Sequence, residues 1–174
     1  MVAGIQVNTL NNANIYIDGN SLLGQAEEFK LPVVKFKMAE HKAVGMVGAI
    51  KLPSGFEALE GEIKWNSFYA NVWPKLLDPF TPVQLQARGS LETYTSQGRT
   101  QQVPYVVFLT ASFYEVPTGD FKQNDKAEFS SKFYATYIKQ QVNGADVLEV
   151  DAMANIYKVG GVDKLDLYRT NIGG

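Results

Sequence analysis

Residues 83–93 have the sequence Val-Gln-Leu-Gln-Ala-Arg-Gly-Ser-Leu-Glu-Thr, and this stretch decides the fold class. Apolar or small residues at the odd positions alternate with mostly polar residues at the even positions. A period of two is typical of a β-strand with one packed and one wet face. Turn residues Thr95–Gly98 follow, and residues 102–116 are rich in β-branched and aromatic side chains. The sequence therefore predicts a long β-hairpin.

A second hairpin is centred on Asn143-Gly144, a dipeptide suited to the positive φ angles of a type I′ turn. Its incoming arm is predicted over Phe129–Val142. Its outgoing arm is predicted as one continuous strand with two unlike faces. The packed face comprises Leu148, Val150, Ala152, Ala154 and Ile156, and the wet face comprises Glu149, Asp151 and Asn155.

A third hairpin is predicted on both sides of Val44–Gly48, where two glycines mark a flexible tip or bend. Its first arm alternates Val34, Phe36 and Met38 with Lys35 and Lys37, and its second arm contains Ile50 and Leu52. Short strands are also expected at Leu59–Trp65 and at Ile15–Ile17.

One helix is predicted over Asn66–Leu77, with Asn66 or Ser67 as its N-cap. Apolar residues at helical spacing define its inner face: Phe68, Val72, Trp73, Leu76 and Leu77. Pro74 leaves two possibilities. Either it kinks the helix, or the helix begins near Asn71 and Pro74 occupies its tolerant first turn.

Composition places these elements in one folded domain, residues 1–174. The chain is 45% hydrophobic and 12% aromatic, and it contains no repeat, low-complexity tract or linker. It has 16 Lys and Arg against 18 Asp and Glu, a net charge of −2, with one His and no Cys. This composition excludes disulfides, thiolate zinc sites and sites that need several imidazoles, and it argues against a general polyanion binder.

Membrane and export signals are also missing from the sequence. No apolar run approaches the roughly 18 residues of a membrane-spanning helix, and the first residues lack a basic and then apolar leader. We therefore expect a protein that does not insert into membranes and is made in the cytoplasm.

No residue pattern points to catalysis, a metal or a cofactor. His41 lies between Glu40 and Lys42 and is expected to be solvated. Three pairs of nearby carboxylates can be considered for acid–base catalysis, but spacing alone is weak evidence, and solvated strand faces or loops explain them better. They are Glu57 with Glu60, Asp146 with Glu149, and Asp163 with Asp166. We therefore expect a protein that is not an enzyme.

The basic residues of the third hairpin favour an acidic protein surface over nucleic acid as its partner. They are Lys35, Lys37, Lys42 and Lys51. Long hairpins in a chain of this size also leave strand edges open, and open edges pair with other chains. Physical reasoning thus predicts a β-rich, oligomerising protein.

The sequence resembles the major tail tube proteins of contractile-tailed, myovirus-type phages, a family also found in R-type pyocins. The C-terminal part carries most of the likeness and ends in a characteristic Arg-x-Asn-Ile-Gly. The matching segments are Asn14–Gly19, Lys30–Pro32, Gly45-Met46-x-Gly48, Tyr137–Lys139, Val142–Gly144, Leu148–Asp151, Tyr157–Leu165 and Tyr168–Gly173. The likeness is weaker over Pro53–Gln123.

The resemblance implies a β-sandwich or half-barrel subunit with one short helix, six of which close a β-barrel ring. Rings would stack into the inner tube of the tail, inside the sheath, and genome DNA and the tape measure protein would pass along it. Further implied partners are the baseplate hub and the tail terminator. The expected location is the virion, after assembly in the bacterial host cytoplasm.

Three groups of residues are the candidate sites for this function. The hairpin tip that contacts the next ring comprises Val44, Gly45, Met46, Val47 and Gly48. The polar residues that face the lumen or outer wall are Gln84, Gln86, Arg88, Ser90 and Glu92, with Lys35 and Lys37. Terminal contacts are expected from Met1–Asn12 and Arg169–Gly174, in particular Arg169, Asn171 and Ile172.

Two alternative functions remain open from the sequence. A tube subunit of an R-type tailocin or of a type VI-like contractile injection system would have the same ring geometry. A small monomeric β-barrel that binds an apolar ligand would also be β-rich and without catalytic residues. The oligomeric state distinguishes the second from a tube.

Overall fold

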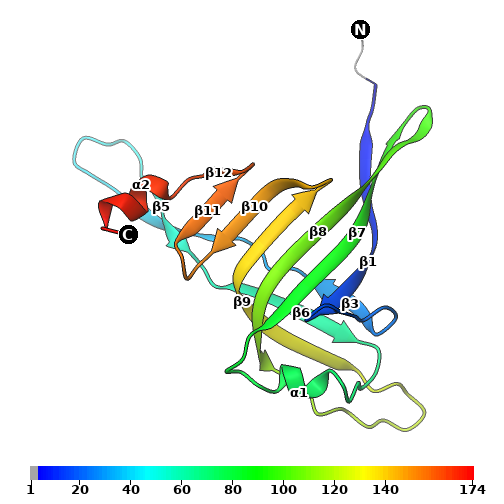
Figure 1. Ribbon diagram of the computed structural model, residues 1–174. Helices are drawn as coiled ribbons and strands as arrows, with labels where there is room; N and C mark the ends of the chain where they lie inside the picture. The colour runs from blue at the N-terminus through cyan, green and yellow to red at the C-terminus, as the bar shows by residue number, and fades with distance from the viewer. Residues whose placement is uncertain (1–3) are drawn as a thin grey trace.

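The computed structural model describes residues 4–174, and one large antiparallel sheet dominates it (Figure 1). The strands follow the order β12-β11-β10-β9-β8-β7-β1-β2 across this sheet. Their bounds are β1 Val7–Ile17, β2 Asn20–Ser21, β7 Val83–Thr95, β8 Gly98–Glu115, β9 Phe129–Val142, β10 Ala145–Asp151, β11 Ile156–Val159 and β12 Val162–Asp163. Strands β3 (Ala26–Lys30) and β6 (Leu59–Trp65) join the sheet through β9.

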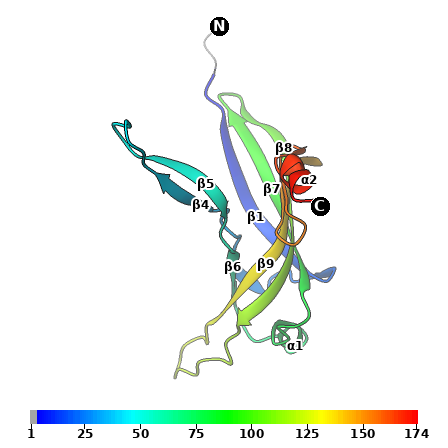
Figure 2. The ribbon, with the colours of Figure 1, turned by 90° about the vertical axis from the view of Figure 1, so that its left-hand side faces the viewer.

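Strand β9 divides the sheet into two branches. Its first half, Phe129–Ala135, pairs with β6, whereas Tyr137–Val142 pairs with β10. Between the halves, Thr136 has no partner residue on β8, because Ala135 lies opposite Ala111 and Tyr137 opposite Thr110. A bulge of this kind bends a strand. In Figure 2 β6 accordingly diverges from the main sheet instead of continuing its plane.

The core lies between these branches and helix α1 (Trp73–Leu76). Trp65 of β6 meets Trp73 at a ring distance of 5.7 Å, and Trp73 meets Phe129 of β9 at 5.5 Å. Both indoles are satisfied, since the Trp65 Nε1–H donates to Ser131 Oγ and the Trp73 Nε1–H donates to the Pro117 carbonyl. Buried aromatic groups with paired polar atoms fix one arrangement of the two branches.

The structure confirms both long hairpins of the sheet. Strands β7 and β8 pair across Thr95 and Gly98, and Val83, Leu85 and Ala87 are buried on one face of β7. Asn143 and Gly144 connect β9 and β10 with φ angles of 51° and 78°. The predicted strands at Leu59–Trp65 and Ile15–Ile17 are also present, and β3 was not predicted.

The predicted continuous strand to Ile156 is wrong. Strand β10 ends at Asp151, whose carboxylate accepts hydrogen bonds from the backbone N–H groups of Met153 and Ala154. Asn155 then adopts a φ of 53°, and the chain returns as β11. An Asp side chain that binds backbone two residues onward competes with the strand ladder, which is why alternation did not reveal this turn.

The predicted helix is shorter than expected, and its predicted caps are wrong. Helix α1 covers only Trp73–Leu76, and its N-cap is Val72, without a side-chain cap. Pro74 lies in the first turn, which is the second of the two possibilities that the sequence left open. The side-chain amide of Asn66 donates instead to the Gly24 carbonyl. A second short helix, α2 (Asp166–Asn171), was not predicted.

The third predicted hairpin is formed by β4 (Phe36–His41) and β5 (Ile50–Phe56), a separate two-stranded sheet. Every residue of β4 and nearly every residue of β5 is exposed. Only its base is anchored, where Phe36 and Phe56 pack on Tyr157 of β11. In Figure 2 the hairpin projects away from the main sheet.

Candidate channel and assembly surfaces

The main sheet has one face that the rest of the described chain leaves uncovered, and we call it the polar face. Cross-strand pairing aligns its residues in rows, one of which crosses the six strands from β7 to β12. This row comprises Gln86, Phe108, Lys139, Glu149, Lys158 and Asp163. The opposite face carries the buried partners of the core, such as Leu109 and Ile138.

Five of the sequence-predicted polar residues lie together on the polar face. Gln84, Gln86, Arg88, Ser90 and Glu92 alternate along β7 with residues of the core face. The Arg88 guanidinium lies over the Tyr16 ring, 5.9 Å from its centroid. The structure therefore groups these residues on one face of β7.

Glu92 differs from the other four because its side chain is enclosed by hydrogen-bond donors. The Tyr94 hydroxyl donates to it at 2.6 Å, Arg99 at 3.0 Å, Asn11 at 3.1 Å and Gln102 at 3.2 Å. The Tyr94 hydrogen bond contributes most to a lowered pKa of Glu92, and Arg99 adds to it. The cluster ties the edge strand β1 to the β7–β8 hairpin.

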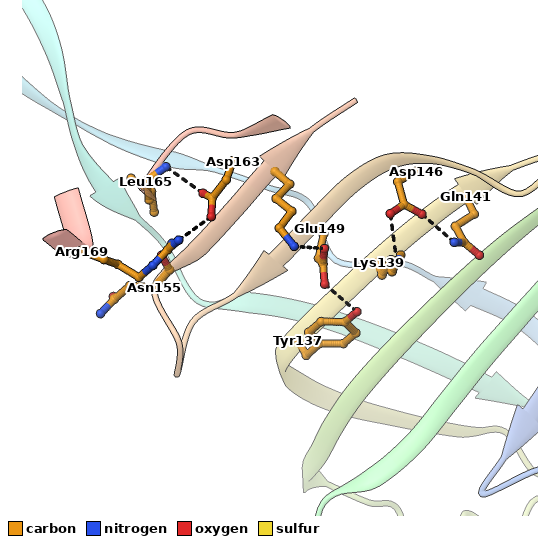
Figure 3. Close-up of polar contacts among 10 residues, drawn as sticks. Tyr137, Lys139, Gln141, Asp146, Glu149, Asn155, Asp163, Leu165 and Arg169 are labelled. Atoms are coloured by element: carbon orange, nitrogen blue, oxygen red, sulfur yellow. Dashed lines mark hydrogen bonds and ion pairs between the residues drawn. The ribbon is translucent and has the colours of Figure 1, made fainter. Parts of the chain in front are cut away.

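Ion pairs cross the C-terminal half of the polar face (Figure 3). Lys139 of β9 lies 3.0 Å from Asp146 of β10, and Lys158 of β11 lies 3.0 Å from Glu149 of β10. The Tyr137 hydroxyl also donates to Glu149 at 3.1 Å. Each of these two lysines therefore has a carboxylate partner within its own chain.

The pKa directions agree with this arrangement. The Gln141 amide and Lys139 lower the pKa of Asp146. Burial raises the pKa of Tyr137 to about 12, and its hydrogen bond to Glu149 adds to the shift. The lowered pKa keeps the Asp146 carboxylate charged near neutral pH, and Lys139 lies beside it as its counter-charge.

Lys35 and Lys37 are not among the polar-face residues. Both are exposed at the start of the β4–β5 hairpin, so the structure does not bring them to Gln84 and its neighbours. Strand alternation alone could not separate them, because period two is the same in a sheet and in a free hairpin.

The tip of this hairpin, Ala43–Ala49, has no charged residue. The side chains of Val44 and Val47 are fully exposed, with relative exposures of 106% and 109%. Gly45 has a φ of 90°, which favours glycine at this turn. All five predicted tip residues are thus presented together at the end of a projecting arm (Figure 1).

The predicted terminal contacts divide into two kinds. The Arg169 guanidinium is bound within the chain, 2.6 Å from Asp163 and 2.8 Å from the Asn155 carbonyl, and it holds α2 against β12 (Figure 3). Asn171 and Ile172 are exposed. Of Met1–Asn12, residues 1–3 lie outside the described residues, and Ile5, Val7 and Leu10 are exposed.

The residues considered for catalysis are either exposed or held in ion pairs within the chain. His41, Glu57 and Glu60 are exposed, and Asp146, Glu149 and Asp163 hold the cations described above. Within residues 4–174 no cluster of His, Cys, Asp and Glu is arranged to hold a metal ion. No helix in that range is both long and apolar enough to cross a membrane.

The sequence did not single out Lys139 and Lys158 as site residues. Their signal was present, because Tyr137, Lys139 and Gln141 alternate with residues of the core face, and the Asn143-Gly144 turn brings β10 beside them.

Both ends of the main sheet are also open. Within residues 4–174, β1 has β7 as its one partner beyond its pairing with β2 at Tyr16 and Ile17, and β12 pairs with β11 alone.

A sequence profile of the family described as phage tail tube protein FII matches residues 7–173. The chain belongs to the phage tail tube family. It is therefore a structural component of the virion, which confirms its expected role as a tail tube subunit, and this structural role agrees with the expectation that it is not an enzyme.

Individual relatives agree with the family. The chain is 28% identical to the tail tube protein of Escherichia phage P2 over 92% of this tail tube subunit and 94% of that protein. It is 26% identical to the major tail tube protein of Serratia phage KSP20 over 84% of each chain. The fold is also similar to a solved chain of the sheath/tube terminator of an extracellular contractile injection system. That match has a TM-score of 0.57 and 12% identity, and it covers 75% of this subunit and 93% of that chain.

Proposed function

We propose that six copies of this subunit close a ring and that stacked rings form the inner tube of a contractile tail. The observation that carries this proposal is a sheet with open ends at β1 and β12 and an uncovered polar face. Joining the β12 end of one copy to the β1 end of the next pairs edges that a single chain leaves open. Closure is the arrangement that removes sheet edges altogether.

In this ring the polar face lines the channel. The core face carries β3, β6 and α1, so it forms the wall that faces outward. Ion pairs on the polar face keep Lys139 and Lys158 from offering free cations to phosphate groups. DNA and the tape measure protein would therefore pass without strong attachment, because each free cation adds a phosphate contact.

The β4–β5 hairpin supplies the contact between rings. Its uncharged tip, with Val44 and Val47 fully exposed, gains free energy when another copy covers it. Exposed apolar residues near the termini, such as Ile172, are available for further ring or sheath contacts. The tail sheath, baseplate hub and tail terminator complete the proposed partners.

The same ring would serve an R-type tailocin or a type VI-like contractile injection system. The likeness to an injection-system chain concerns the fold, and that fold is common to both settings. The genes beside this one distinguish them, since a tail that delivers a genome requires capsid genes.

Negative-stain electron microscopy of the purified protein tests the proposal. We expect hollow rings or tubes at high protein concentration, with a stain-filled central channel. A sample that stays monomeric by sedimentation velocity across the concentrations used for microscopy would contradict it and favour a monomeric binding module.

A further inference from the structure

A cavity of about 330 Å³ opens beside β1 on the core-face side of the sheet, where β3 faces β1 and β7. Its walls are mainly apolar and include Leu10, Ile15, Phe29 and Leu31. Two acidic residues of β3, Glu27 and Glu28, also line it and are exposed. We call this the β1–β3 cavity. Its volume is at the small end of the range for sites that hold a ligand or a few side chains.

Leu10 shows that this part of the core face lacks a cover in the single chain. It belongs to the core side of β1, opposite Leu91, yet it is 51% exposed. Ile15, further along the same strand, is buried. An apolar surface that is covered at one end and open at the other is a place for a complementary apolar group.

The hairpin tip Ala43–Ala49 has the chemistry to fill such a cavity. It is uncharged, and its valines have no cover of their own. The two sites cannot meet within one chain. In Figure 1 the tip lies on the far side of the molecule from β1 and β3.

Charge around the two sites is complementary. Between residues 35 and 51 the hairpin has four Lys and one Glu, so 4 − 1 gives +3. Strands β3 and β6, residues 26–30 and 59–65, have four Glu and two Lys, so 2 − 4 gives −2. Opposite charge steers two surfaces together and fixes their register.

Direction also favours contact between copies. The hairpin extends past α2, at the end of the sheet opposite β1, and on the side away from the polar face (Figures 1 and 2). The tip therefore projects on the same side of the sheet as the one on which the cavity opens. When two copies meet through two different surfaces, each copy keeps one of these surfaces free for a further copy, so the contact can repeat along an assembly.

We propose that the β1–β3 cavity of one subunit is the receptor for the β4–β5 hairpin tip of a neighbouring copy, with Glu27 and Glu28 facing the hairpin lysines. This inference rests on the proposed tube and names the surface that the tip contacts. It makes Leu10, Phe29 and the two glutamates assembly residues, although none of them lies on the hairpin.

Cysteine cross-linking tests the contact directly, because the natural chain has no Cys. The double variant Ala13→Cys with Val47→Cys places one thiol at the cavity and one on the tip. Assembled and oxidised, it should give a ladder of covalent multimers on a non-reducing gel. An equal mixture of the two single variants should stop at covalent dimers, and each single variant alone should remain monomeric. Tubes of the double variant without any cross-link would overturn the proposal.

Charge exchange gives a second test that does not depend on thiol geometry. Glu27→Lys with Glu28→Lys should reduce the yield of tubes by about tenfold or more at low salt. Adding Lys42→Glu and Lys51→Glu to the same chain should restore most of that yield. Recovered tube yield in the four-fold variant would support the pairing, because misfolding cannot restore assembly. A four-fold variant that melts like the wild type but forms no tubes would contradict the pairing.

A larger side chain in the cavity tests whether its occupant is a neighbouring copy or a small apolar ligand. Ala13→Phe should prevent tube growth, whereas Ala154→Phe, an exposed alanine in the β10–β11 turn, should not. Normal tubes from Ala13→Phe would show that the tip binds elsewhere. Because tubes still form in that outcome, it would leave the proposed tube intact and remove only the assignment of the receptor.

Discussion

The main sheet and the β4–β5 hairpin differ in how they use apolar residues. The sheet buries them, and Ile63, Phe133 and Ile138 have no exposed surface. The hairpin exposes them, and Val44 and Val47 lack any cover. Burial of apolar area stabilises the fold of one chain, whereas exposed apolar area gains free energy only from another chain. The comparison assigns folding to the packed face of the sheet and the contact between rings to the hairpin.

The largest expected effect tests the folding half of this comparison. Phe133 is fully buried and lies against Phe29 and Phe113, with ring distances of 5.9 and 5.4 Å. Phe133→Ala should lower the free energy of unfolding by about 3–5 kcal/mol, because it leaves a cavity where the two branches meet. Urea denaturation measures the change. A loss below about 1 kcal/mol would show that the core is organised differently.

Gly61 tests how closely β6 approaches its neighbours. A Cβ at this position would lie 2.7 Å from the Lys30 carbonyl oxygen, so backbone would have to move. Gly61→Ala should destabilise the subunit by about 1–3 kcal/mol. Gly48→Ala on the hairpin is the matched control, because a Cβ there would have no other atom within 4 Å. Equal unfolding midpoints for the two variants would contradict the difference between sheet and hairpin.

Glu92 gives a smaller effect that depends on pH. Because the pKa of Glu92 is lowered in the folded chain, it stabilises the fold above its unfolded pKa of about 4.5. That contribution is lost as the pH falls through the folded pKa. Glu92→Gln should therefore lower stability at pH 7 and flatten the fall in melting temperature between pH 5 and pH 3. An unchanged acid profile would refute the role of this carboxylate.

The paired charges of the polar face affect function more than stability. Asp146→Asn with Glu149→Gln frees Lys139 and Lys158 while keeping side-chain size. Tubes of this variant should retain duplex DNA to higher salt than wild-type tubes, with log K falling more steeply by about 0.9 for each additional phosphate that a lysine neutralises. Gradient sedimentation with labelled DNA measures retention. The same salt dependence for both tubes would show that the polar face does not line the channel.

Sequence patterns predicted the elements whose residues repeat with a fixed period. Val83, Leu85 and Ala87 revealed the packed face of β7, and Asn143-Gly144 marked the turn between β9 and β10 without ambiguity. The patterns failed where one polar side chain overrides the period. Asp151 ends β10 by binding backbone, and Asn66 binds the Gly24 carbonyl instead of capping a helix.

The candidate surfaces could be predicted from sequence only where their residues are close together in the chain. Residues adjacent in the chain, such as the tip Val44–Gly48, could be grouped from sequence alone. The pairs Lys139–Asp146 and Lys158–Glu149 depend on the register of three strands, and a bulge at Val147 shifts that register by one residue. The β1–β3 cavity combines residues of four separate strands, β1, β3, β7 and β8, so no local pattern contains it.

The most direct test of the division between sheet and hairpin is sedimentation velocity of Met46→Asp, with Met153→Asp as the matched control. Both methionines are exposed, one on the hairpin tip and one in the β10–β11 turn. An exposed substitution should change stability by less than about 0.5 kcal/mol in either variant. We expect Met46→Asp to sediment as folded subunits or single rings and Met153→Asp to sediment as long polymers. Polymers of wild-type length from Met46→Asp would contradict the assignment of the contact between rings to the hairpin.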